Sequence, residues 1–378
     1  MMFRRRFIHA TYSRETKYLF NTSYISSMNK KLLDDVVIIR LILIILLVLY
    51  HSFAIYNGAW DMPNGIHSVN TYYWIASLSY SFLLETFVFV SGYVFGYQVR
   101  TKYNNQLSFN NSIIKKAKRL LIPGIIFSLI YFLCFNLKFG YSVRTVIYCI
   151  IVGEGHLWYL PMLFSCFAAI YILEKFHLSS RNTIVIALLA SLFSLGPLSN
   201  LPFRISTTMY YFLFFVIGYL INKSNVSINC LSQPKSILLF FIIWIITFIL
   251  YQYFSYQHQN IDNYDFPFWL TIMDSLFRRL LRVLQATFGL LMTLGLVKYL
   301  IKKSIIHVSS LSIKLSTYCF GVYIFQQFIL NFIVTNPFIT ESLGSYLLPW
   351  VSFLFTLIIS LLVTGLFLRT RLGRYLIG

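Results

Sequence analysis

Long apolar runs separated by short polar segments occupy almost the whole chain. Ten of these runs come close to the ~20 residues that a helix needs to cross a bilayer; they lie at 33–56, 75–97, 120–138, 156–175, 182–198, 208–222, 236–254, 280–300, 314–335 and 346–368. A shorter apolar run, 145–152, cannot span and is expected to be re-entrant or interfacial. The pattern predicts an all-α polytopic membrane helical bundle with about ten transmembrane helices.

Composition points to the same class of protein. Of the 378 residues, 58% are hydrophobic and 11% are charged, whereas a soluble domain has about 25% charged residues. The five cysteines show no C-x-x-C spacing, and no cluster of metal ligands is evident in the sequence. We therefore expect an integral membrane protein without a disulfide framework, a metal site or a bound cofactor.

The positions of Lys and Arg predict how the bundle is oriented. With the N-terminus inside, 24 of the 31 basic residues fall in cytoplasmic segments and six in outer segments, while Arg40 lies within the membrane. Short cytoplasmic loops carry the excess of basic residues in membrane proteins, so both termini are expected to be cytoplasmic. The net charge of +20 then follows from topology, and the expected partner is the lipid bilayer rather than nucleic acid.

Two parts of the chain differ in character. Residues 1–28 form a basic, polar extension without the apolar stretch of a signal peptide. Met28 directly precedes the first span, so an over-called translation start is an alternative for this extension. Residues 29–378 are expected to form one transmembrane domain, with no internal repeat evident.

The first span carries a cation and an imidazole within its apolar sequence. Arg40 and His51 are eleven positions apart, which is about three helical turns and ~16 Å of rise, so both point to one side of the helix. The plain alternative is an arginine that snorkels to the inner interface and a histidine near the outer headgroups. Ionisable residues inside a span usually mark a functional path, and the shared face favours that interpretation.

Five further segments follow in order: ETFVFVSGY at 85–93, KKAKRLLIP at 115–123, GHLWYLPML at 155–163, YYFLFFVIGY at 210–219 and RLGRYLIG at 371–378. Together with the Arg-x10-His spacing, they resemble the acyltransferase 3 family of membrane O-acyltransferases, which modify bacterial surface sugars. Each segment alone is a weak signal, because apolar aromatic strings are common in membranes. Six in register, over about residues 29–378, form a specific pattern.

This resemblance implies an enzyme of the bacterial inner membrane that moves an acyl group from cytoplasmic acyl-CoA, most simply acetyl-CoA, to a hydroxyl of a glycan. The acceptor would be a surface or lipid-linked glycan such as capsule, O-antigen or exopolysaccharide. The resemblance also implies that His51 is essential and that Arg40 helps to hold the donor. His51 would act as a general base or carry the acyl group as acyl-imidazole, and the sequence leaves both routes open.

Basic residues near the cytoplasmic side form a second candidate for donor binding. Lys115, Lys116 and Arg119 precede the third span in the company of Lys118. Such a run is most often only a signal for topology. The alternative is that it attracts the phosphates of CoA or anionic lipid headgroups.

Three outer residues and one carboxylate within a span are candidates for acceptor binding. Glu154, His156 and Trp158 lie on the side of His51, with Trp158 as a platform for a sugar ring or simply part of an aromatic belt. Glu85 shares a helix face with Gly92 and Gly96, which predicts a packed seam. Its carboxyl would either be neutral or paired with Arg278 or Arg282, or else orient His51 or bind the sugar.

Three arginines lie where the positive-inside pattern disfavours them. Arg278 and Arg282 share a helix face one turn apart, with Arg279 between them. The plain interpretation is pairing with Asp265 or Asp274, or a wrong orientation of the two adjoining spans. The alternative is an anion site for acidic sugars or a lipid-linked phosphate.

Two positions depart from the family pattern, and two other classes of protein compete with the enzyme. Gln326 occupies a position where the family commonly has histidine, and Val37 stands where an aspartate is typical. Gln326 cannot titrate, which leaves His51 as the main acid–base candidate and weakens a mechanism with a second histidine. A transporter or flippase would be expected to show repeated halves, and a polysaccharide polymerase a large outer loop, whereas the stretch 255–276 is short.

Overall fold

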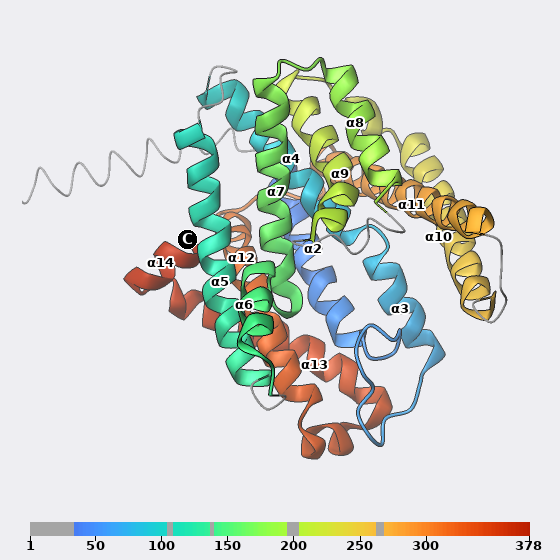
Figure 1. Ribbon diagram of the computed structural model, residues 1–378, viewed down its shortest axis with the longest axis vertical. Helices are drawn as coiled ribbons and strands as arrows, with labels where there is room; N and C mark the ends of the chain where they lie inside the picture. The colour runs from blue at the N-terminus through green and yellow to red at the C-terminus, as the bar shows by residue number, and fades with distance from the viewer. Residues whose placement is uncertain (1–33, 104–108, 137–139, 195–203, 262–267) are drawn as a thin grey trace, which may run out of the picture.

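The computed structural model describes residues 34–103, 109–136, 140–194, 204–261 and 268–378 as a bundle of helices (Figure 1). The predicted extension, residues 1–28, lies outside this part of the chain. The long helices are α2 (Asp34–Phe53), α4 (Leu83–Lys102), α5 (Lys115–Phe135), α7 (Tyr159–Lys175), α9 (Ile205–Lys223), α10 (Pro234–Ile261), α11 (Phe268–Lys302), α12 (Ser310–Val334) and α13 (Pro337–Phe367). Shorter helices are α3 (Asn70–Tyr80), α6 (Val143–Val152), α8 (Ser180–Leu192), α14 (Arg371–Ile377) and the single turn η3 (Gly155–Trp158).

The described residues confirm the predicted helical bundle and contain no strand. Among them, nine helices are long and apolar enough to cross a membrane, counting α3 with α4 as one span. The run predicted at 182–198 is the shorter helix α8, of 13 residues, and residues 195–203 lie outside the described part. The run at 145–152, predicted to be too short to span, is the ten-residue helix α6.

Ion pairs show which helix ends lie together. Glu174 near the end of α7 pairs with Lys223 at the end of α9, with Nζ 2.6 Å from Oε1. The chain therefore leaves this end of the bundle along α8 and returns to it along α9, so α8 takes the place of the fifth predicted pass. Asp35 at the start of α2 pairs with Lys298 near the end of α11 at 2.9 Å, so these two ends also lie together.

α2 lies at the centre of the bundle and runs parallel to α12 (Figure 1). Near its start, the carbonyl of Arg40 lies 3.7 Å from Sγ of Cys319. Near its end, Nδ1 of His51 lies 3.0 Å from Oε1 of Gln326. Both contacts are made with α12, so the backbone at Arg40 and the side chain of His51 lie against the same neighbouring helix.

α4 and α9 pack so closely that side chains are excluded at three positions. A Cβ added at Gly92 would lie 2.1 Å from the carbonyl oxygen of Phe215, and one at Gly96 would lie 2.2 Å from that of Tyr219. From the other helix, a Cβ at Gly218 would lie 2.2 Å from the carbonyl oxygen of Phe89. The packed seam predicted from Gly92 and Gly96 is therefore present, and it holds Glu85 inside the bundle.

The segment between α2 and α3 is fixed to the start of the long part of α13. Gly344 breaks α13 with a φ of 61°, which leaves the following residues turned toward this segment. The hydroxyl of Tyr56 donates to the carbonyl of Ser345, and the amide of His67 donates to the Ser345 hydroxyl at 2.8 Å. Burial raises the pKa of Tyr56, which keeps its hydroxyl protonated as a donor.

We expect Gly92→Ala to destabilise the protein, because the added methyl meets backbone atoms that cannot rotate away. Overpacking of this kind costs about 1–3 kcal/mol or more, which exceeds the gain in helix propensity of roughly 1 kcal/mol. The measurement is the thermal unfolding temperature in detergent, with size-exclusion chromatography used to detect the loss of folded protein.

Gly124→Ala is the matched control, because its Cβ would lie 3.6 Å from the nearest atom. That variant should unfold at the wild-type temperature or above it. Equal unfolding temperatures for Gly92→Ala and wild type would contradict the close packing of α4 on α9.

Candidate active site

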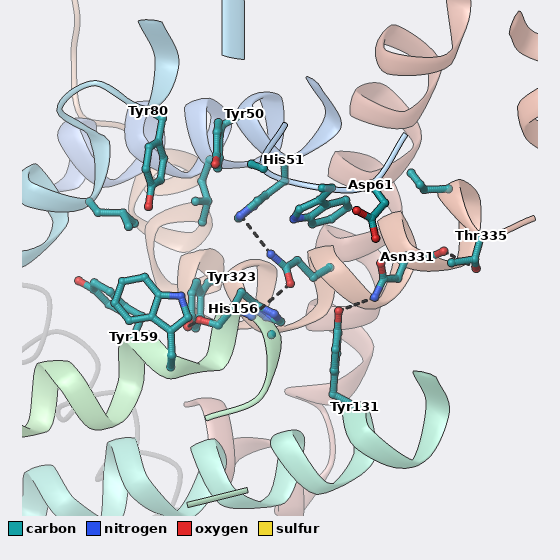
Figure 2. A pocket seen from close by; sticks show the side chains of 18 residues that line it. Tyr50, His51, Asp61, Tyr80, Tyr131, His156, Tyr159, Tyr323, Asn331 and Thr335 are labelled. Carbon is teal, nitrogen blue, oxygen red and sulfur yellow. Dashed lines mark hydrogen bonds between the residues drawn. The ribbon is translucent and has the colours of Figure 1, made fainter. Parts of the chain in front are cut away.

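A cavity of about 570 Å³ lies where α2, the turn η3 and α12 meet (Figure 2). Its polar lining includes residues that are far apart in the chain: Tyr50, His51, Trp60, Asp61, Tyr80, Tyr131, His156, Trp158, Tyr159, Tyr323, Gln327, Asn331 and Thr335. The volume is in the range of ~300–1,000 Å³ that is typical of small-molecule sites. Two histidines and several hydroxyl and amide groups therefore converge on one space.

The hydrogen bonds of His51 fix its tautomer. Oε1 of Gln327 accepts from the backbone N–H of His156 at 3.2 Å, so the Gln327 amide nitrogen is the group that faces His51. This nitrogen lies 3.1 Å from Nε2 of His51, which makes Nε2 an acceptor without a proton. The proton of the neutral ring is then on Nδ1. Gln326 has its Oε1 3.0 Å and its Nε2 2.9 Å from this atom, and only the oxygen can accept the hydrogen bond.

His156 is held in the opposite tautomer. Its Nε2 lies 3.0 Å from the carbonyl oxygen of Ile324, which can only accept, so Nε2 carries the proton. Its Nδ1 is buried and has no hydrogen-bond partner in the part of the chain that the structure describes. The side chain of Gln327 links the two residues, since it contacts the backbone of His156 and the ring of His51; both histidines are labelled in Figure 2.

Glycines bring His156 into this position. Gly153 and Gly155 have φ angles of 94° and 54°, which an L side chain rarely adopts. A Cβ at Gly155 would also lie 3.0 Å from the ring of Tyr131. The turn that follows α6 therefore needs these glycines, and it directs the next residue into the cavity.

An aromatic residue of the segment after α2 covers His51. The ring of Trp60 stacks on the imidazole with a centroid distance of 5.7 Å and an interplanar angle of 21°. Asp61 follows it and lines the same cavity. Trp60, Asp61 and Gln327 were not identified from the sequence as site residues. Only Gln327 had a sequence signal, because it directly follows Gln326, the position that departs from the family pattern.

Cations gather around the other end of the face that α2 presents to α12. Arg40 interacts electrostatically with Arg119, and Lys116 interacts with both of them. Nζ of Lys116 lies 4.7 Å from the ring centroid of Phe167. Within the described residues, none of these three cations forms an ion pair. The structure thus brings together three of the four predicted donor-binding residues, while Lys115 is exposed at the start of α5.

The predicted acceptor residues fall into different positions. Trp158 and His156 line the cavity of His51. Glu154 lines neither this cavity nor the one described below; its Oε1 accepts from Nδ2 of Asn136 at 2.8 Å. Arg278 also lies outside both cavities, where its Nε is 2.9 Å from Asp274, as in the plain interpretation of that residue. Asp265 lies outside the described residues.

Glu85 is paired with an arginine, one of the two alternatives stated for it. Its Oε1 accepts from Arg282 at 3.0 Å and from the hydroxyl of Tyr210 at 2.8 Å. The carboxyl is completely buried, and its other oxygen has no partner. Arg282 also donates to the carbonyl of Tyr80, at 3.2 Å.

A comparison with protein families decides the class of this chain. The family model described as an acyltransferase domain, Acyl_transf_3, matches residues 34–369. The chain belongs to the acyltransferase 3 family. It is therefore a membrane-embedded acyltransferase, and the match covers both ends of the α2 face and the whole lining of the cavity. The comparisons with curated proteins and with solved structures give no match.

We expect Glu85→Gln to destabilise this acyltransferase by about 3 kcal/mol, because it leaves the charge of Arg282 unpaired in a buried place. The measurement is the thermal unfolding temperature of the purified protein in detergent.

Arg278→Gln is the control, because the pair with Asp274 is partly exposed and such pairs contribute about 1 kcal/mol or less. Equal destabilisation by the two substitutions would contradict a special role for the Glu85–Arg282 pair.

Proposed function

We propose that this acyltransferase moves an acyl group, most simply acetyl, from cytoplasmic acyl-CoA to a hydroxyl of a surface or lipid-linked glycan. The acceptor class is a capsule, O-antigen or exopolysaccharide, and the location is the bacterial inner membrane. The observation that carries the proposal is the arrangement along α2. Cations without an ion-pair partner among the described residues surround Arg40, and His51, with its unprotonated Nε2, lines a cavity.

Donor binding near Arg40 is inferred from the local charge. Arg40, Lys116 and Arg119 form no ion pair within the described residues, and the positive-inside pattern puts them toward the cytoplasm. Phosphates are the groups that such a cluster binds, with the guanidinium of Arg40 able to hold two oxygens at once. The ~16 Å of helix between Arg40 and His51 then runs alongside the pantetheine arm.

The acceptor end rests on the tautomer of His51. A glycan hydroxyl that enters the cavity replaces the Gln327 amide as the donor to Nε2. As the hydroxyl oxygen attacks the thioester carbonyl, its proton passes to Nε2, the C–S bond breaks and CoA leaves as a thiolate that takes up a proton. Gln326 keeps its bond to Nδ1–H throughout, so the ring stays oriented while it is charged.

His51 can also act as the nucleophile. Nε2 then attacks the thioester, CoA leaves, and the acyl-imidazole passes its acyl group to the glycan hydroxyl. In this route the acceptor hydroxyl needs a second base. His156 lines the same cavity, and its Nδ1 has no hydrogen-bond partner among the described residues. His156 then acts as the second base. Gln326 cannot take this role, because its amide does not titrate.

We expect His51→Ala to abolish O-acylation of the surface polysaccharide, because it removes the group that takes the proton; loss of a general base costs about 10²–10⁴-fold in rate. The measurement compares polysaccharide from a deletion strain that carries either the wild-type or the variant gene. His307→Ala, at an exposed histidine outside the cavity, is the control. Full O-acylation with His51→Ala present at normal levels would refute the proposal.

We expect Arg40→Gln to raise the KM for acetyl-CoA about tenfold, because it removes a charge-assisted contact with the donor phosphates. The matched control is Arg181→Gln, which removes an exposed arginine at the start of α8. The measurement is CoA release by purified protein at a series of donor concentrations and two salt concentrations. An unchanged KM would exclude Arg40 from donor binding.

A further inference from the structure

A second cavity adjoins that of His51 and carries a different set of groups. Its volume is about 460 Å³, and it lies between α3, α9, α10 and α11. Tyr80 and Trp158 line both cavities, so the two cavities lie side by side. Arg279 and Arg282 are the charged residues among those that line it, and the rest are neutral.

The three arginines of α11 differ in how their charge is compensated. Arg278 pairs with Asp274 outside the cavity, and Arg282 pairs with buried Glu85. Arg279 forms no ion pair within the part of the chain that the structure describes. Its guanidinium lies 4.6 Å from the ring centroid of Tyr210, and its buried Nε has no hydrogen-bond partner.

The charge of Arg279 is only partly compensated. Its side chain is of intermediate exposure, and a cation that loses part of its water needs a partner or hydrogen bonds to offset that loss. The contact with the Tyr210 ring provides only part of this. Arg282, three positions further along α11, adds repulsion. The described lining contains no carboxylate, and its polar groups other than the two arginines, such as Gln252 and Ser255, are neutral. Glu85 lies outside the lining and pairs with Arg282.

The neutral groups of this cavity suit a sugar. Aromatic rings from Tyr80, Trp158 and Tyr251 supply flat apolar faces, while Gln252 and Ser255 supply hydrogen-bonding groups. Gln252 is held by the hydroxyl of Tyr73 at 3.1 Å. The cavity therefore combines surfaces for a sugar ring with one uncompensated cation.

We propose that the Arg279 cavity binds an anionic group of the acceptor, either a carboxylate of an acidic sugar or the phosphate of a lipid-linked saccharide. The reacting hydroxyl then lies in the adjoining cavity, at His51. This inference rests on the proposed glycan acceptor and narrows it to anionic saccharides. Arg279 makes the anion contact, and Arg282 stays neutralised by Glu85 and shapes the wall.

The kinetic test uses purified protein in lipid nanodiscs with labelled acetyl-CoA and matched acceptors. One pair is a glucuronate-containing oligosaccharide and its glucose counterpart; the other is a polyprenyl-diphosphate-linked saccharide and the free saccharide. Arg279→Gln should raise the KM for the anionic member of one pair at least tenfold and erase its advantage over the neutral member. Arg279→Lys should restore part of it, and Arg278→Gln should behave as wild type.

The pair that responds identifies the source of the anion. An effect with glucuronate assigns the site to a sugar carboxylate, and an effect with the diphosphate-linked saccharide assigns it to the lipid-linked phosphate. Unchanged kinetics of Arg279→Gln with both pairs, in a protein that unfolds at the wild-type temperature, would overturn the inference.

A binding measurement separates this inference from the proposed function. Glucuronate or inorganic pyrophosphate should raise the unfolding temperature of wild type and Arg278→Gln but not of Arg279→Gln, whether or not any acceptor is acylated. Protection of all three proteins alike, or of none, would refute an anion site at Arg279. Failure of wild type to acylate any acceptor, with selective protection intact, would refute the proposed reaction alone.

Discussion

The architecture depends on one constraint, which is that a guanidinium and an imidazole on the same transmembrane helix cannot face lipid. α2 meets this constraint by lying inside the bundle, in contact with α3, α4, α11, α12 and α13. Both of its polar ends are covered by α12, at Cys319 and at Gln326. The other helices form layers around α2, and the glycine seam between α4 and α9 allows them to pack close enough to enclose it.

Amide side chains organise the centre of the cavity. Gln326 has no charge to gain or lose, so it keeps its hydrogen bond to Nδ1–H when His51 takes a proton on Nε2, whereas the Gln327 amide gives up its own bond to Nε2. Gln327 links the two histidines by accepting from the backbone of His156 and donating to His51. This arrangement leaves one imidazole nitrogen of each histidine without a proton. A histidine at position 326 would itself gain and lose a proton. With glutamine there, position 326 only orients the imidazole, and His51 takes the proton.

Local patterns in the sequence predicted those features that a single helix determines. The last predicted run, 346–368, begins just after the break that Gly344 makes in α13, and the spacing of Arg40 and His51 needed only the helical repeat. Gln327 escaped prediction because it reaches His51 from a distant part of the chain. Trp60 lies nine positions after His51, but in an irregular segment whose course the helical repeat does not predict. Glu85 had two alternatives in the sequence, and only the position of Arg282 on another helix decides between them.

The cations that depart from the positive-inside pattern say more about the functional site than those that follow it. The positive-inside pattern explains why most Lys and Arg residues fall on one predicted side, but it does not require Arg40 to lie within the first span. On the other side of the bundle, each arginine of α11 opposes the pattern and therefore needs a local reason. Asp274 compensates the charge of Arg278, and Glu85 compensates that of Arg282. Arg279 has no such protein partner among the described residues, so its partner is best sought in the substrate.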